Sequence, residues 1–206
     1  FGRFAGIIGC YNSLNLYLET IGEPVMSRAY DLGSYSKLLQ SIEKKDFKNA
    51  RILITGDGRV AKGTLELLKS TNINEVSPEN FLKDKNSLGV FCNLQTSQYL
   101  KRLDDQKFNL QHFIKFPNKY ISIIDQYMYS SNILISSHYW DPKSPRLFEK
   151  KDLENYKKLI VIGDITCDIN GSIPTTIRST TIKDPNFYLD KKFFKEIKKD
   201  NKALAI

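Results

Sequence analysis

The chain has 206 residues, of which 41% are hydrophobic and 26% charged, a balance typical of a globular protein with its own core. No run reaches the roughly 18 uninterrupted apolar residues of a membrane-spanning helix, and the N-terminus lacks the cleavage pattern of a signal peptide, so no membrane partner is expected. The net charge, 31 − 23 = +8, permits an anionic ligand or a nucleic acid.

The first 70 residues predict two helices, a strand and a third helix. Residues 3–20 have a helical pattern whose small residues allow close packing, and "SYSKLLQSIEKKDF" (34–47) predicts a second helix with Ser34 as its N-cap. The β-branched run "ARILIT" (50–55) suits a buried parallel strand, and "RVAKGTLELLKS" (59–70) returns to helical spacing. A strand that leads directly into a helix is typical of α/β proteins.

The rest of the chain continues this alternation. Four more strands are predicted at 73–76, 88–94, 132–136 and 158–164, and two more helices at 118–131 and 150–158. The stretch 95–117 is long and polar for a connection, and loops of that length are often functional or partly helical. The sequence therefore predicts an α/β fold, a Rossmann-like doubly wound parallel sheet with helices on both faces.

The basic runs and the cysteines narrow the choice of partners. In "KKFFKEIKKDNK" (191–202), Phe193, Phe194 and Ile197 recur at helical spacing, which predicts an amphipathic helix rather than an arm that binds nucleic acid. We therefore expect no nucleic-acid partner. Three cysteines fit neither a zinc site nor a disulfide framework, which predicts a reducing, cytoplasmic location: Cys10, Cys92 and Cys167.

A glycine turn joins the strand at 50–55 to the helix at 59–70. Its sequence, "GDGRVA", matches the dinucleotide-binding pattern G-x-G-x-x-G/A. Gly56 permits the tight turn, Gly58 leaves room for a pyrophosphate, and Ala61 lets the helix lie close to the strand. The free N–H groups at the helix N-terminus would face the phosphates. There are two alternatives to dinucleotide binding: a purely structural turn, and a methyltransferase turn that binds an adenosyl group.

The same pattern predicts an acidic residue about 20 positions on, which would bind the ribose. That place falls near Val76 and Ser77, where the sequence has no carboxylate. Ser77 is able to form a hydrogen bond with either a 2′-hydroxyl or a 2′-phosphate, and no arginine is adjacent. The choice between NAD and NADP therefore stays open.

Two stretches follow strands at the edge where an open α/β sheet binds its ligand. "SSHYWDPKSPRL" (136–147) holds His138, a candidate general acid or base whose more common role beside aromatic residues is packing. In "GDITCDINGSIPTT" (163–176), Asp164 and Asp168 are candidates to contact the edge of a nicotinamide or a substrate ammonium group. Their alternative role is to cap a turn. No His or Cys pair joins them with ligand spacing, so no metal is expected.

Five segments, in order along nearly the whole chain, carry a family resemblance. They are "FGRFAGIIG" (1–9), "GDGRVAKGTLELL" (56–68), "YWDPKSPRL" (139–147), "IGDITCDINGSI" (162–173) and "TTIKDPNFY" (180–188). Together they resemble the cofactor domain of the saccharopine dehydrogenase and lysine–ketoglutarate reductase group, which is related to alanine dehydrogenase. The third and fourth segments are far more specific than the glycine motif.

The resemblance implies a two-domain enzyme in which a single NAD(P)-binding Rossmann domain, here residues 1–206, interrupts a substrate domain. Residues 1–48 would then be connecting helices, 49–180 the nucleotide-binding core and 181–206 the return toward the substrate domain. In the family a Lys and a His of the preceding domain carry much of the proton chemistry, so this chain alone is expected to hold the cofactor without turnover. The implied reaction is reversible hydride transfer between NAD or NADP and the amino-bearing carbon of an amino acid or a saccharopine-like substrate.

The resemblance also implies a set of site residues. Asp168 would be catalytic, near the nicotinamide, and Ser77 stands where these reductases tend to carry an acid. The implied partners are an amino acid or 2-oxo acid and the substrate domain of the same chain, and assembly into a homo-oligomer stays open. A non-catalytic nucleotide-binding module and an S-adenosylmethionine-dependent methyltransferase are the alternative functions. The residues expected to bind the cofactor are Gly56, Asp57, Gly58, Arg59, Val60, Ser77, Ser136, Ser137, His138, Asp164 and Ile165.

Overall fold

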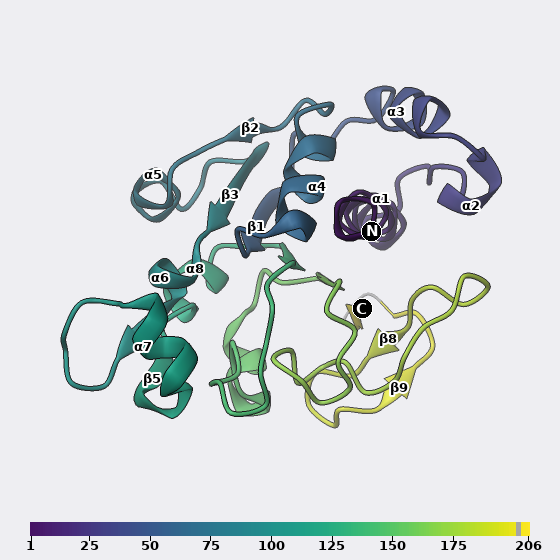
Figure 1. Ribbon diagram of the computed structural model, residues 1–206. Coiled ribbons are helices and arrows are strands. Elements are labelled where there is room, and N and C mark those ends of the chain that lie inside the picture. The colour runs from purple at the N-terminus through teal and green to yellow at the C-terminus, as the bar shows by residue number, and fades with distance from the viewer. Residues whose placement is uncertain (201–202) are drawn as a thin grey trace.

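The computed structural model describes residues 1–200 and 203–206 (Figure 1). Within them, eight strands form one sheet in the order β2-β3-β1-β6-β7-β10-β8-β9. Neighbours from β2 to β10 run parallel, whereas β8 and β9 pair antiparallel at one edge. The strands are β1 (Arg51–Thr55), β2 (Asn74–Glu75), β3 (Val90–Leu94), β6 (Ile133–Ser136), β7 (Val161–Asp164), β8 (Tyr188–Leu189), β9 (Glu196–Ile197) and β10 (Leu204–Ala205).

The central strands are rich in apolar residues because both faces of the sheet are covered. All five residues of β1 are buried, with Ile52 and Ile54 in one hydrophobic cluster and Leu53 in the other. In the parallel register, Thr55 lies beside Leu94 of β3 and Ser136 of β6. The carboxyl ends of these three strands therefore meet at one edge.

Helices cover both faces of the sheet, as predicted (Figure 1). One face carries α1 (Gly2–Thr20), α2 (Ala29–Leu32), α3 (Tyr35–Glu43) and α4 (Arg59–Leu68). The other face carries α5 (Pro78–Lys83), α8 (Asp125–Met128) and the 3₁₀-helix η2 (Lys150–Asn155). The expected doubly wound α/β architecture is confirmed. In the part of the chain that the structure describes, none of the helices has the length and apolar character needed to cross a membrane.

The glycines of α1 and α4 bring the two helix backbones into direct contact. A methyl group at Gly6 would lie 1.9 Å from the carbonyl oxygen of Val60, and one at Gly63 would lie 2.0 Å from that of Arg3. The guanidinium of Arg3 also donates two hydrogen bonds to the carboxylate of Glu66 across this contact. The close packing predicted for the first helix is confirmed, and it holds α1 beside the start of α4.

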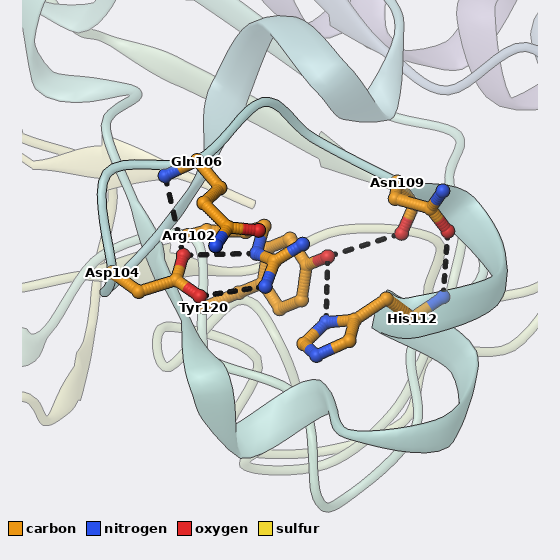
Figure 2. Close-up of polar contacts among 6 residues, drawn as sticks. All are labelled: Arg102, Asp104, Gln106, Asn109, His112 and Tyr120. Carbon is orange, nitrogen blue, oxygen red and sulfur yellow. Dashed lines mark hydrogen bonds and ion pairs between the residues drawn. The ribbon is translucent and has the colours of Figure 1, made fainter.

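The long connection after β3 folds into a small unit of its own. It contains α6 (Thr96–Tyr99), β4 (Leu100–Arg102), α7 (Leu110–Lys115), the 3₁₀-helix η1 (Pro117–Lys119) and β5 (Tyr120–Ser122), and β4 pairs antiparallel with β5. The hydroxyl of Tyr120 donates to the carbonyl of Asn109 at 3.0 Å and lies 3.1 Å from Nδ1 of His112 (Figure 2). Arg102 and Asp104 form an ion pair at 2.6 Å in the same unit. The partly helical character expected for 95–117 is confirmed.

Of the two helices predicted in the middle of the chain, the first is wrong and the second is confirmed in part. The helix at 118–131 is replaced by η1, β5 and the short α8, because Tyr120–Ser122 pairs with β4 and leaves the helical conformation. At 150–158 the chain forms a 3₁₀-helix that ends at Asn155, since Tyr156 leaves helical geometry with a ψ of 69°. Of the other predicted helices, that at 34–47 ends at Glu43, although its N-cap Ser34 accepts from the Lys37 N–H as expected.

The amphipathic helix predicted at 191–202 is also wrong. The carboxylate of Asp190 accepts hydrogen bonds from the N–H groups of Lys192 and Phe193, and Phe194 has a φ of +52°, so the chain turns there. Glu196–Ile197 then forms β9. Residues 201–202 of the predicted helix lie outside the described residues.

Candidate functional site

The glycine turn after β1 requires glycine at its first position. Gly56 has a φ of +107°, and a methyl group there would lie 2.7 Å from the carbonyl oxygen of Ser137 and 2.9 Å from Cα of His138. The N–H of Gly56 donates to the carbonyl of Leu94 at 2.9 Å. Gly56 therefore packs the turn between the ends of β3 and β6.

Gly58 has a different role, because the space around it is open. It is the N-cap of the ten-residue helix α4, it is exposed, and a methyl group built on it would have nothing within 4 Å. No side chain caps this helix. The N–H groups of the first turn of a helix have no partner within the helix, and the helix dipole places positive charge at the same end. The turn is thus a cradle that is open at Gly58 and suited to a phosphate or diphosphate, with the start of α1 packed against Arg59 and Val60 on one side.

The cradle lies where the strand order changes direction. From β1 the chain proceeds to β2 and β3 on one side and then crosses to β6, β7 and β10 on the other. In open parallel sheets this switch point leaves a crevice at the carboxyl ends of the strands, where ligands bind. The switch point of the sheet and the open N-terminus of α4 therefore indicate the same ligand-binding edge.

His138 is buried beside the cradle and is held by hydroxyl groups. Its Nδ1 lies 2.8 Å from the hydroxyl of Thr55, and its Nε2 lies 3.0 Å from the hydroxyl of Ser172. Burial lowers the pKa of His138 from its ordinary 6.5 to about 4. The ring also contacts that of Tyr99, with 5.7 Å between centroids. A neutral imidazole with both nitrogens engaged is suited to packing and orientation rather than to proton transfer.

The two serines before His138 support the same edge. Ser136 and Ser137 are both buried, and the hydroxyl of Ser137 lies 3.2 Å from that of Thr64 on α4. The N–H of Ser137 donates to the carbonyl of Thr55 at 3.1 Å. Side-chain and main-chain contacts of Ser137 thus fix the end of β6 against α4 and β1.

Asp164 is a partly buried carboxylate at the end of β7 that already accepts from several donors. Thr166 donates to it from its hydroxyl at 2.6 Å and from its N–H at 3.1 Å, and the hydroxyl of Thr176 donates at 2.6 Å. Burial raises the pKa of Asp164, and these hydrogen bonds oppose the rise. Asp168 differs, because its side chain is exposed on the turn that follows. Of the two carboxylates, Asp168 is the more accessible to a ligand.

A cleft of about 680 Å³ lies between α1 and the segment 176–187. Asp164 and Ile165 form part of its wall together with Gly9 and Asn12 of α1. The glycine turn and Asp168 are not among the residues that line it. The structure therefore places Asp164 and Ile165 on this cleft, whereas Gly56, Ser137 and His138 lie at an edge around the glycine turn.

Ser77 lies away from both groups. It follows β2, which pairs with β3 and not with β1, and its exposed side chain accepts a hydrogen bond from the N–H of Asn80 at the start of α5. Sequence analysis missed the hydroxyl groups that hold His138 and Asp164, on Thr55, Ser172 and Thr176. Only Thr55 could have been found from the sequence, because it stands at the end of the predicted strand 50–55, next to the glycine turn. Among the described residues, no group of three or more His, Cys, Asp or Glu residues is arranged to hold a metal ion.

Comparisons with known proteins find similarity to alpha-aminoadipic semialdehyde synthases. It matches no protein-family model. Alpha-aminoadipic semialdehyde synthase of Arabidopsis thaliana is 30% identical over 157 residues, 66% of this chain and 15% of that protein. The mitochondrial alpha-aminoadipic semialdehyde synthases of Rattus norvegicus and Bos taurus are each 25% identical over 227 residues, which cover 90% of this chain and 24% of each relative.

The chain is therefore similar, at 25–30% identity, to the alpha-aminoadipic semialdehyde synthases. The expected resemblance to the saccharopine dehydrogenase and lysine–ketoglutarate reductase group is thereby confirmed at the level of that group. The chain spans about a quarter or less of the length of the curated relatives it matches. Two of these relatives are named as mitochondrial, so the cytoplasmic location expected for this chain stays a prediction.

Proposed function

We propose that this chain is the NAD(P)-binding domain of an amino-acid oxidoreductase of the saccharopine and alanine dehydrogenase type. The observation that carries the proposal is the uncovered N-terminus of α4 behind Gly56 and Gly58. It stands at the switch point of a parallel sheet, and the relatives are synthases of alpha-aminoadipic semialdehyde. The two findings are independent, since one concerns geometry and the other sequence.

The cradle residues would hold the diphosphate of the cofactor. Gly58 leaves the approach open, and the main-chain N–H groups of Arg59 and Val60 belong to the first turn of α4. The guanidinium of Arg59 adds a positive charge at the exposed mouth, and Asp57 is its exposed neighbour across Gly58. When bound, the cofactor supplies the hydride donor and acceptor, and the protein supplies orientation and electrostatics.

The edge at the ends of β6 and β7 would orient the nicotinamide half and the substrate. The neutral His138, fixed by Thr55 and Ser172, would act as a rigid wall. Asp164 and Ile165, at and just after the end of β7, would lie beside Ser136 at the same edge. The exposed carboxylate of Asp168 would favour the positive charge of a substrate ammonium group. In this proposal Asp168 is the one catalytic residue of the chain.

The substrate would be an amino acid or 2-oxo acid held against a substrate domain of the same polypeptide. Since the proton chemistry of the family rests on that domain, the 206-residue chain would bind cofactor without turnover. A non-catalytic nucleotide-binding module would share the same cradle. A natural full-length product without a substrate domain would favour that alternative.

Titration of the purified chain with NADH, NADPH and S-adenosylmethionine tests the proposal. We expect NADH or NADPH to bind and their fluorescence to change, with no binding of S-adenosylmethionine. Gly58→Leu should abolish nucleotide binding without unfolding the chain, because Gly58 has an ordinary φ of −80° and free space around it. Lys62→Leu, on the exposed side of the same helix, is the matched control and should bind as the wild type does.

Two results would contradict the proposal. One is a chain that binds neither nicotinamide nucleotide while its melting curve shows a folded protein. The other is a Gly58→Leu variant with unchanged affinity. Selective binding of S-adenosylmethionine would favour the methyltransferase alternative instead.

A further inference from the structure

In the sheet, β3 lies between β2 and β1. The residue next to the glycine turn therefore follows β3 and not β2. Ile54 lies beside Asn93, Thr55 lies beside Leu94, and the ladder continues with the N–H of Gly56 donating to the carbonyl of Leu94. Gln95 therefore stands level with Gly56. Ser77 follows β2, one strand farther out.

In dinucleotide-binding folds, the adenosine ribose is recognised by a polar side chain at the end of the strand beside the glycine-turn strand. That strand is normally the second in the chain, which places the residue about 20 positions after the glycines. Here β2 and α5 come between, so Gln95 follows Gly58 by 95 − 58 = 37 positions. Counting along the sequence selects Ser77, whereas the sheet order selects Gln95.

The segment that begins with Gln95 is fixed beside the glycine turn. The side chain of Gln95 accepts a hydrogen bond from the N–H of Gln98, and the N–H of Gln95 donates to Oε1 of Gln98 at 2.7 Å. Tyr99, at the end of this short helix, contacts the ring of His138. Burial raises the pKa of Tyr99 to about 12, and the charge of Asp57 in the glycine turn contributes to the rise.

Gln95 and Asn93 offer unused hydrogen-bonding capacity at this edge. Gln95 is exposed, and a glutamine amide has two N–H donors in addition to its oxygen. Oδ1 of Asn93 is buried and has no hydrogen-bond partner among the described residues. Gln95 lies one residue past the end of β3 with an extended backbone, so the alternation of side chains along a strand places it on the same side as Asn93. Of the two, the exposed amide of Gln95 is the group that a ribose diol reaches, and it both donates and accepts.

We propose that Gln95, rather than Ser77, contacts the adenosine ribose and sets the choice between NAD and NADP. The proposal rests on the proposed function. Because the amide of Gln95 is neutral, it accommodates a 2′-hydroxyl without repelling a 2′-phosphate. The wild-type chain is therefore expected to bind NADH and NADPH with Kd values within about tenfold of each other.

Nucleotide titrations of charge variants test this assignment. Gln95→Glu is nearly isosteric and should weaken NADPH relative to NADH by about tenfold or more, because a carboxylate repels the 2′-phosphate. Gln95→Arg should shift the ratio of Kd values in the opposite direction. The matched control is Ser77→Asp, which should leave the ratio within about threefold of the wild type.

The opposite shifts expected for Gln95→Glu and Gln95→Arg distinguish recognition of the 2′-position from damage to the fold. A variant that merely loosens the segment around α6 weakens both nucleotides together, which leaves the ratio unchanged and overturns the assignment. A ratio that moves with Ser77→Asp instead also overturns it, as does a wild-type preference above about a hundredfold. If the folded wild type binds neither nucleotide, the proposed function fails together with this inference. If it binds them and Gln95 has no effect on the ratio, only this inference fails.

Discussion

At the scale of single residues, His138 shows how burial decides between two roles that the sequence leaves open. The pattern around it is compatible with a general acid or base and with a packed histidine. The structure encloses the imidazole between the hydroxyls of Thr55 and Ser172 and lowers the pKa of His138 to about 4. The sequence does not contain this information, because Ser172 is 34 positions away and reaches the ring only through the fold.

The lowered pKa of His138 predicts an acid-sensitive stability. The unfolded chain binds a proton near the ordinary pKa of 6.5, whereas the folded chain resists until about 4. The stability contributed by the neutral imidazole is therefore complete above about pH 6.5 and is lost as the pH falls toward 4, with a total of about 3 kcal/mol. The free energy of unfolding in urea, measured at pH 7, 5.5 and 4.5, should fall more steeply for the wild type than for His138→Gln. Equal slopes would contradict a buried neutral imidazole.

At the scale of elements, the contact between α1 and α4 depends on the absence of side chains. Gly63 lies against the main chain of Arg3, which is unable to move away without shifting the whole helix. The sequence predicts small residues for close packing but does not name the opposing helix. The strand β1, the turn and α4 are predicted correctly because their signals are local, a β-branched run followed by glycines and helical spacing.

Gly63→Ala tests this contact, because close packing and loose packing predict changes of opposite sign in the free energy of unfolding. In a free helix, alanine is more stable than glycine by about 1 kcal/mol, so a loosely packed position would gain stability. Because a methyl group at Gly63 would lie 2.0 Å from the carbonyl oxygen of Arg3, we expect a loss of about 2–4 kcal/mol in the free energy of unfolding. Gly58→Ala, which meets nothing within 4 Å, should change it by less than about 1 kcal/mol. Chemical denaturation measures both, and a stabilised Gly63→Ala would contradict the packing described.

The two helices that were predicted wrongly fail for different physical reasons. Tyr120–Ser122 has enough helical spacing to suggest a helix, but pairing with Leu100–Arg102, from which α7 and η1 separate it, is preferred. Phe193 and Ile197 also recur at helical spacing, yet the turn capped by Asp190 separates them. A distant pairing partner overrides the helical pattern in the first case, and a turn capped by the neighbouring Asp190 does so in the second.

At the scale of the whole molecule, the α/β class follows from the alternation of strands and helices, but the order of the strands does not. The sequence gives no direct measure of which of β2 and β3 lies beside β1, since both are short and both follow α4. This is why counting positions leads to Ser77 and the structure leads to Gln95. The edge around the glycine turn could be predicted from the motif, whereas the separate cleft beside α1 could not, because distant segments form it.

The most direct test of the central claim is an amide chemical-shift titration of the folded chain with NADH. The account predicts that the largest shifts fall on the cradle, residues 57–61, and on the end of β3, residues 93–96, and that Gly58→Leu removes them. Shifts confined to the cleft between α1 and the segment 176–187, with the cradle amides unchanged, would contradict it.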